Sequence, residues 1–168
     1  MIPRKFHFVR FKAPSERGGK PFVYANYLCI YSAIKNHPGA EFYFHCNYDI
    51  QSPWFELLKP YLNIVKAEAP DDIFGIPIKR VEHQADIFRM RTLLKYGGIY
   101  LDTDVFIIKP LDELLEHNFV MGIENGMGLC NGVILSEKDS IFEANSDNSC
   151  TCLSSTPLAM IEAKSNNF

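Results

Sequence analysis

The sequence predicts an α/β domain with a mostly parallel central sheet. Strand-like and helix-like segments alternate along its first 143 residues, an order that is typical of βαβ units. A long apolar run at 96–108, YGGIYLDTDVFII, reads as a buried strand yet contains two aspartates. Ligands of such sheets usually bind beyond the carboxyl ends of the strands. This run therefore combines a core element with a candidate site.

The first half of the domain is predicted to alternate strands and helices. One helix is expected to begin at Pro21, which suits a first turn, because apolar side chains then recur at helical spacing. Another should begin after Ser52, a residue type that caps helix N-termini. The predicted elements are strands over 6–11, 41–48 and 63–69 and helices over 21–35 and 53–62, followed by a Pro- and Gly-containing loop.

The second half begins with a helix over 81–96, which Gly97 and Gly98 should end. The apolar run follows as a strand. Asn131–Gly132 fits either a hairpin turn or a site asparagine. The remaining predicted elements are a short helix over 110–116 and strands over 119–124 and 129–136.

The composition changes near residue 144. We expect a domain over 1–143 and a poorly ordered, polar tail over 144–168 with a short helix over 158–163.

The overall composition is that of a globular protein. Of 168 residues, 47% are hydrophobic, and a net charge of −3 without a basic stripe argues against nucleic acid as a partner. No apolar stretch reaches the length of a membrane span, and the first residues do not resemble a secretory signal. Five irregularly spaced cysteines indicate free thiols. The predicted location is the cytoplasm, or the Golgi lumen if an anchor precedes this segment.

Asp102 and Asp104 are unusual because burying a carboxylate costs several kcal/mol unless it is paired or bound to a metal. In a strand the two would share one face, with Cα atoms about 6.6 Å apart. A cation is expected in front of that face. Hard divalent cations such as Mn²⁺ or Mg²⁺ prefer oxygen ligands and neutralise a leaving diphosphate.

Asp86 is a second unexpected carboxylate. On a helical wheel it falls inside the apolar arc of its helix, with Arg89 at the border of that arc. One interpretation is an i,i+3 ion pair on a half-buried face. The other is that the Gly97–Gly98 turn brings Asp86 and Arg89 to the sheet end that holds Asp102 and Asp104.

The context of the two aspartates carries a family resemblance. From His83 to Asp104 the chain reads HQADIFRMRTLLKYGGIYLDTD. This stretch resembles the DXD-containing glycosyltransferases of the capsular-polysaccharide and α-mannosyltransferase type, which are similar to the catalytic domains of glucosylating toxins. IPRKFHFVRF near the start and GLCNGVILS at 128–136 resemble further segments of that family.

The resemblance implies a GT-A-like (Rossmann-like) domain that binds a nucleotide-sugar donor. It also implies a divalent metal, Mn²⁺ or Mg²⁺, and retaining transfer to a glycan or glycolipid acceptor. By position, Asp102 and Asp104 would be the catalytic residues and metal ligands, Asp104 directly and Asp102 through water. The implied donor-binding residues are Phe8, Val9, Asp86, Arg89, Tyr100 and Asp102.

The chain departs from the family at two points. Position 10 is Arg where the family tends to have Trp, and the sequence reaches its Ser/Cys-rich tail where the family continues into acceptor-site elements. A non-catalytic or truncated nucleotide-sugar-binding module is therefore an alternative. A glycoside hydrolase is another, although hydrolases take their two carboxylates from separate elements.

Overall fold

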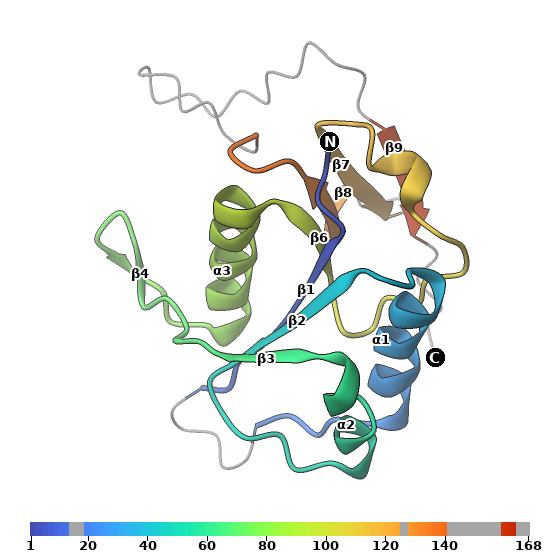
Figure 1. Ribbon diagram of the computed structural model, residues 1–168. Helices are drawn as coiled ribbons and strands as arrows, with labels where there is room; N and C mark the ends of the chain where they lie inside the picture. Colours follow the sequence, from blue (N-terminus) through green and yellow to red (C-terminus); the bar gives the residue numbers. More distant parts are fainter. Residues whose placement is uncertain (14–18, 125–127, 141–158, 164–168) are drawn as a thin grey trace.

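The computed structural model describes residues 1–13, 19–124, 128–140 and 159–163, which form an α/β domain around one large sheet (Figure 1). The sheet has the strand order β3-β2-β1-β6-β8-β7-β9. Its first four strands run parallel and are β3 (Asn63–Lys66), β2 (Glu41–Cys46), β1 (Lys5–Arg10) and β6 (Gly98–Leu101). The others are β8 (Gly128–Ser136), antiparallel to both neighbours, β7 (Phe119–Glu124), and β9 (Ala159–Ala163), parallel to β7.

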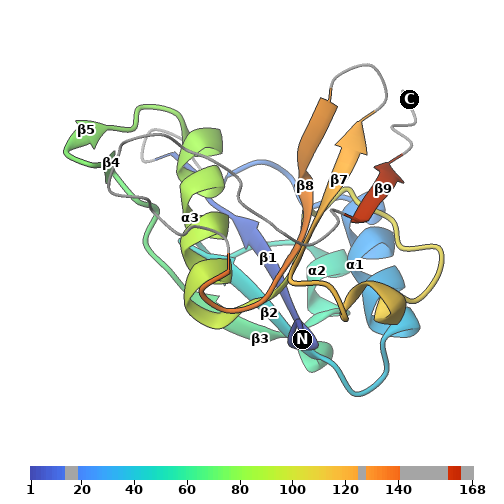
Figure 2. The ribbon, with the colours of Figure 1, turned by 90° about the horizontal axis from the view of Figure 1, so that it is seen from above.

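Helices cover both faces of the parallel part of the sheet (Figures 1 and 2). Helix α3 (Val81–Tyr96) lies on one face, and α1 (Tyr24–Asn36) lies on the other beside α2 (Pro53–Glu56). Single turns η1 (Lys59–Tyr61) and η2 (Asp112–Leu114) complete the helical part. None of the helices in the described ranges is both long and apolar enough to cross a membrane.

The strand alternation of β1 divides the core into two layers. Phe6 and Phe8 are fully buried in the layer that contains Ile30 of α1. Val9 belongs to the opposite layer, together with Leu93 of α3. The central strands β1 and β6 are buried on both faces over most of their length, whereas the edge strand β3 is largely exposed.

Helix α1 begins three residues later than the sequence predicted. Pro21 precedes the helix, and the backbone N–H of Val23 donates to Asn26 Oδ1 at 3.0 Å. An amide side chain at the third helical position thus satisfies a donor at the helix start. The predicted cap of α2 is present, since Ser52 Oγ accepts from the N–H of Trp54.

The strand predicted over the apolar run is much shorter, so the two aspartates do not share a strand face. Strand β6 ends at Leu101. Its last ladder bond runs from the N–H of Asp102 to the Gly132 oxygen, and the N–H of Val105 then donates to the Asp102 oxygen, which turns the chain. Phe106 is consequently 56% exposed. Asp102 and Asp104 lie at the carboxyl end of β6 instead.

The pair Asn131–Gly132 does not form a hairpin turn. Both residues lie within β8, where the pairing with β7 shifts register between Met121 and Gly122. The irregularity places Gly132 beside the end of β6.

Residues 159–163 form strand β9 in place of the predicted helix. The rest of the predicted tail, residues 144–158 and 164–168, lies outside the described residues.

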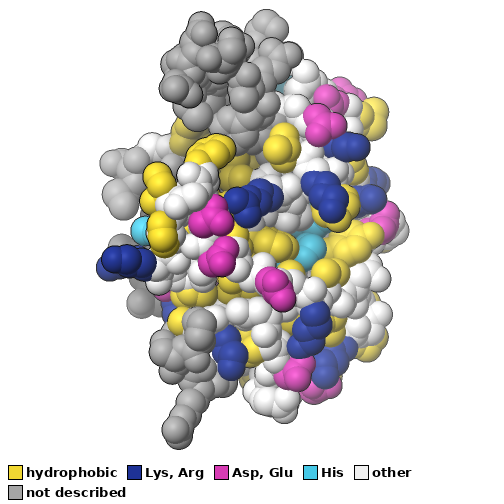
Figure 3. Space-filling model, turned by 90° about the vertical axis from the view of Figure 1, so that its left-hand side faces the viewer, with side chains coloured by type: hydrophobic (Ala, Val, Ile, Leu, Met, Phe, Trp, Pro, Cys, Tyr) yellow, Lys and Arg dark blue, Asp and Glu magenta, His cyan; other side chains and the backbone are white. Residues whose placement is uncertain are grey.

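The segment predicted as a loop between β3 and α3 contains a small hairpin. Strands β4 (Asp72–Ile73) and β5 (Ile76–Pro77) pair there, and Phe74 at the tip is 96% exposed. Figure 3 looks onto this side of the molecule, where hydrophobic patches lie among interspersed acidic and basic side chains.

Candidate donor and metal site

A cavity of about 500 Å³ opens at the carboxyl ends of β1 and β6. Its volume lies within the range expected for a site that binds a small ligand. Its walls come from β1, α1, α3, the turn after β6 and the irregular part of β8. Among its lining residues are Val9, Arg10, Lys20, Asn26, Asp86, Arg89, Tyr100, Asp102, Thr103, Asp104 and Asn131.

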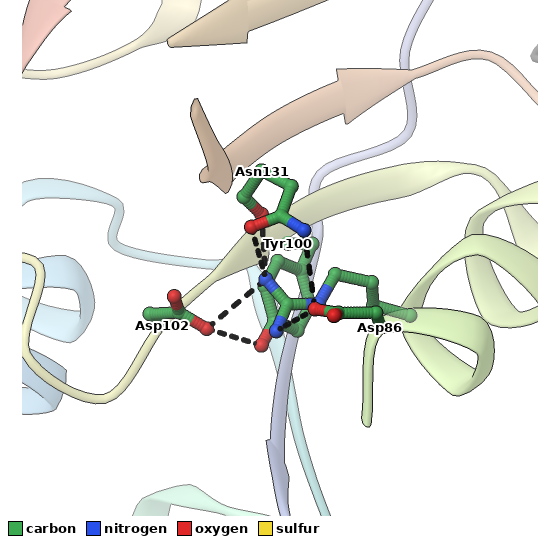
Figure 4. A network of polar contacts seen from close by, with 5 residues as sticks. Asp86, Tyr100, Asp102 and Asn131 are labelled. Atoms are coloured by element: carbon green, nitrogen blue, oxygen red, sulfur yellow. Dashed lines mark hydrogen bonds and ion pairs between the residues drawn. The ribbon is translucent and has the colours of Figure 1, made fainter. Parts of the chain in front are cut away.

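Asp86, Tyr100, Asp102 and Asn131 gather around one point in this cavity (Figure 4). The Arg89 guanidinium contacts all four of them. Its Nη2 is 2.9 Å from Asp86 Oδ1, and its Nη1 is 3.3 Å from Asp102 Oδ1. Nη1 also donates to the backbone oxygen of Asn131 at 2.7 Å. The guanidinium carbon lies 4.3 Å from the centre of the Tyr100 ring, so the cation also interacts with an aromatic face.

The buried guanidinium of Arg89 thus holds both Asp86 and Asp102. The i,i+3 ion pair expected on α3 is present, but Arg89 extends it to the carboxylate at the end of β6. The carboxylate of Asp86 also accepts from Asn131 Nδ2 at 3.1 Å. Since Arg89 is only 6% exposed, these acceptors compensate for the cost of burying its charge.

Asp102 has an asymmetric environment. Oδ1 accepts from the Tyr100 hydroxyl at 2.5 Å and faces Arg89. Burial raises the pKa of Asp102, and the neighbouring Arg89 charge partly opposes this effect. Burial also raises the pKa of Tyr100 well above its ordinary value, so its hydroxyl remains a donor. Oδ2 lies next to Gly132, where a Cβ atom would be 3.0 Å away.

Asp104 is exposed in the cavity wall, two residues beyond the half-buried Asp102. Among the residues that the structure describes, it has no hydrogen-bond or ion-pair partner. Burial raises the pKa of the Cys29 thiol in α1 to about 11, and the negative charge of Asp104 adds to this rise. Asp104 is therefore a carboxylate whose oxygens remain available to a ligand.

The Gly97–Gly98 turn brings helix α3 close to β1. Gly97 and Gly98 have φ of 63° and 114°. A Cβ atom on Gly98 would overlap the carbonyl oxygen of Lys5 in β1. Only glycine permits this approach, and it sets the position of Asp86 and Arg89 relative to β6.

Arg10 ties the end of β1 to the turn after β6. Its Nε donates to the Tyr48 hydroxyl at 3.1 Å, and Nη1 donates to Thr103 Oγ1 at 3.3 Å. Its Nη2 donates to the backbone oxygens of Lys20 and Pro21. The guanidinium that replaces the family's Trp thus holds the segment that carries Asp102 and Asp104.

The structure separates the two predicted residues of β1. Val9 lines the cavity, whereas the side chain of Phe8 is fully buried in the layer beneath α1. Asp86, Arg89, Tyr100, Asp102 and Asp104 are brought together at one cavity.

Sequence reasoning left Asn131 undecided, although its side chain contacts both Asp86 and Arg89. Its Asn-Gly signature is also typical of a turn, and the sequence contains no signal for the irregular pairing of β8.

The carboxylates of this cavity fit a hard divalent cation whose remaining ligands are substrate phosphates and water. Within the described ranges, no three His, Cys, Asp or Glu side chains form a closed metal site. Asp104 nevertheless offers free carboxylate oxygens, and Oδ2 of Asp102 faces away from the Arg89 contact. Mg²⁺ and similar ions commonly bind through one or two carboxylates together with substrate phosphates and water.

The chain is 34% identical over 154 residues to the curated protein "Glucan organizing enzyme 1" of Cryptococcus neoformans var. grubii serotype A (strain H99). The match covers 84% of this chain and 42% of that protein, so the chain spans less than half of the relative's length.

Solved structures share the fold at low sequence identity. "PaToxG Glycosyltransferase" matches with a TM-score of 0.53 and 16% identity over 82% of this chain and 55% of that one. GlyE, a glycosyltransferase of Streptococcus pneumoniae TIGR4, matches with a TM-score of 0.52 and 16% identity over 84% and 36% of the two chains. The α/β fold is therefore of the GT-A glycosyltransferase type.

One family description matches more than half of the chain. Residues 26–121 match the family described as "Glycosyltransferase sugar-binding region containing DXD motif". The matched range contains the α3 helix, the Gly97–Gly98 turn and the Asp102–Asp104 segment. The chain belongs to this family of DXD-containing glycosyltransferases.

Proposed function

We propose that this domain binds a nucleotide-sugar donor together with Mn²⁺ or Mg²⁺ and transfers the sugar, with retention of configuration, to a hydroxyl of a glycan acceptor. The observation that carries the proposal is the Asp102–Asp104 turn. It sets a half-buried, partly neutralised carboxylate beside an exposed one at the mouth of a cavity of about 500 Å³.

Asp104 would hold the metal directly, and Asp102 would contact it through a water molecule at its Oδ2. The bound cation would supply charge neutralisation for the leaving nucleoside diphosphate. Tyr100 keeps Asp102 oriented through its hydroxyl, and Arg10 keeps the turn in place through Thr103.

Arg89 acts mainly as a positioning residue. Its guanidinium is buried and already contacts two carboxylates and the Asn131 oxygens. It fixes Asp86, whose half-buried carboxylate then presents its second oxygen to hydroxyl groups of the donor sugar. Asp86 and Asp102 both interact with Arg89, which reduces their nucleophilicity. This favours attack by the acceptor on the face from which the diphosphate leaves.

The test is release of nucleotide from a panel of nucleotide sugars, with a short glycan present, in Mn²⁺ and in EDTA. Turnover should require the metal and should fall on the order of 10²–10³-fold in Asp104→Asn, as when one preorganised electrostatic contact is removed. Asp71→Asn is the matched control, because Asp71 is an exposed aspartate near the hairpin, outside the cavity. Metal-dependent donor binding without turnover for any donor would instead identify a binding module.

A further inference from the structure

Five aromatic side chains form a continuous surface feature on the flank of α1 that faces α2. We call the set the aromatic ladder; it consists of Tyr24, Tyr27 and Tyr31 of α1, Trp54 of α2 and Tyr61 of η1. Figures 1 and 2 both show α2 beside α1, which places rings from separate segments on one surface.

The α1 tyrosines follow helical spacing, so they lie one above another. The Tyr24 and Tyr27 ring centres are 5.9 Å apart with planes 16° apart, and those of Tyr27 and Tyr31 are 5.5 Å apart with planes 10° apart. Trp54 lies 4.7 Å from Tyr24 and 6.1 Å from Tyr27. Tyr61 extends the row beyond Tyr31, at 6.3 Å.

Core packing does not account for the whole ladder. The core side of α1 is formed by Cys29, Ile30 and Ala33, which are buried. Tyr27 and Tyr31 are partly buried against this core. In contrast, Tyr24 is 50% exposed, Tyr61 51% and Trp54 37%. A solvent-facing flank of an amphipathic helix ordinarily carries charged or polar residues. A row of half-exposed rings, several bearing hydroxyls, indicates a surface that binds a partner.

The ladder begins in the helical turn that also borders the cavity. Asn26 lines the cavity, and its Nδ2 donates to the Thr103 oxygen between the two site aspartates at 3.1 Å. Tyr24 and Tyr27 belong to the same turn of α1. Asn26 therefore connects the first turn of α1, which carries Tyr24 and Tyr27, to the segment that holds the candidate metal ligands.

We propose that the aromatic ladder binds an extended glycan, the part of the acceptor that does not react. A pyranose ring presents an apolar C–H face rimmed by hydroxyls, which matches rings that offer an apolar face and a phenolic hydroxyl. Several aromatic rings in a row can each stack on one sugar unit of an extended chain. This inference rests on the proposed glycosyltransferase function, which requires an acceptor with hydroxyl groups.

A single-stranded nucleic acid also stacks on aromatic rows, but such platforms lie in basic grooves that follow the phosphates. Here the lysine that follows α2, Lys59, is paired with Glu56, and Lys66 on β3 is paired with Asp49. Lys35, one helical turn beyond Tyr31, is a single exposed cation on α1. These lysines do not line a basic groove along the ladder, which favours a neutral ligand.

The experiment uses Trp54, the single tryptophan of the chain, as the reporter. Short oligosaccharides of glucose and of mannose are titrated into the full chain without metal or nucleotide while tryptophan emission is recorded. A saturable change is expected. Tyr24→Ala and Tyr61→Ala should each raise the Kd about tenfold or more, by analogy with the loss of one stacking partner.

Two control variants separate the outcomes. Tyr96→Ala removes a tyrosine that is exposed on α3, outside the ladder, and should leave the Kd unchanged. Asp104→Asn should lose metal-dependent nucleotide binding yet retain glycan binding, which distinguishes failure of the ladder from failure of the donor site. Unchanged Kd values in Tyr24→Ala and Tyr61→Ala would overturn the proposal. So would ladder-dependent self-association without glycan binding, which would identify a protein-docking surface.

Discussion

At the scale of single residues, the site is organised by one buried cation. Arg89 contacts Asp86 on its own helix, Asp102 at the end of β6 and Asn131 on β8, and its guanidinium lies over Tyr100. A planar fork of donors can satisfy acceptors in several directions at once, which an ammonium group on a flexible stem cannot do. Arg89 is therefore the residue that joins three elements into one site.

Arg89→Lys tests this role. The variant keeps the charge but cannot maintain the contacts to Asp86 and Asp102 together, so both carboxylates should become less well oriented. We expect nucleotide release to fall on the order of 10–100-fold, as for other residues that orient metal ligands. The measurement is the metal-dependent turnover of a nucleotide sugar. Arg91→Lys, an exposed change in the same helix, should behave like the wild type, and equal activity of both variants would contradict the assigned role.

The residue scale also shows what sequence reasoning can reach. Asp86, Arg89, Tyr100, Asp102 and Asp104 were predicted to be close together, and the structure brings them to one cavity. Asn131 was not assigned, because its role depends on the irregular register between β7 and β8. Phe8 was assigned to the donor site, but strand alternation turns its side chain into the core.

At the scale of elements, the strongest local patterns predicted the bounds correctly. Helix α3 and strand β7 occupy the predicted ranges, and Gly97 ends the helix as its C-cap, as the Gly-Gly pair predicted. The strand over 96–108 was predicted too long. Its apolar residues favour a strand, yet the turn closed by the N–H of Val105 and the oxygen of Asp102 ends it. Hydrogen bonding of this kind leaves no periodic signal in the sequence.

Gly98→Ala tests the close approach of the α3–β6 turn to β1. The new Cβ would overlap the Lys5 carbonyl oxygen and would also impose a positive φ on alanine. Gly75→Ala is the matched control, since Gly75 has φ 79° but open space around it. We expect Gly75→Ala to cost about 1–2 kcal/mol and Gly98→Ala to cost a further ~1–3 kcal/mol. Denaturant unfolding measures both, and similar losses would argue against the steric account.

A buried histidine pair joins strands β1 and β2 beneath α3 and predicts a pH dependence of stability. His7 Nδ1 and His45 Nε2 are 3.2 Å apart, and His7 Nε2 is 3.2 Å from the Gly97 oxygen. Burial lowers the pKa of both histidines to about 4. Between that value and the ordinary 6.5, the unfolded chain binds more protons than the folded one, so stability falls as the pH falls.

Thermal unfolding should therefore show a Tm that decreases as the pH is lowered from about 6.5 towards about 4. His45→Phe removes one of the two groups and should make this decrease shallower. His83→Gln alters an exposed histidine and should leave the decrease in Tm unchanged. A wild-type Tm that stays constant across the window, or an unchanged slope in His45→Phe, would contradict the histidine account.

At the scale of the whole molecule, the sheet explains why the site forms where it does. The parallel strands β1 and β6 are adjacent, so their carboxyl ends meet at one edge. The antiparallel strand β8 then brings Asn131 and Gly132 to the same edge. The aromatic ladder starts in the first turn of α1, the turn that Asn26 connects to this edge. The proposed donor cavity and the proposed glycan-binding surface therefore lie on neighbouring elements.

The central claim is that Asp104 and Asp102 hold a divalent cation that joins the domain to a nucleoside diphosphate. It is tested most directly by thermal unfolding with a panel of nucleoside diphosphates, in Mn²⁺ and in EDTA, for the wild type and Asp104→Asn. The wild type should gain stability only with metal, by about 2.7 kcal/mol at a hundredfold excess over Kd, and Asp104→Asn should lose most of that gain. Equal stabilisation in EDTA, or full stabilisation of Asp104→Asn, would contradict the claim.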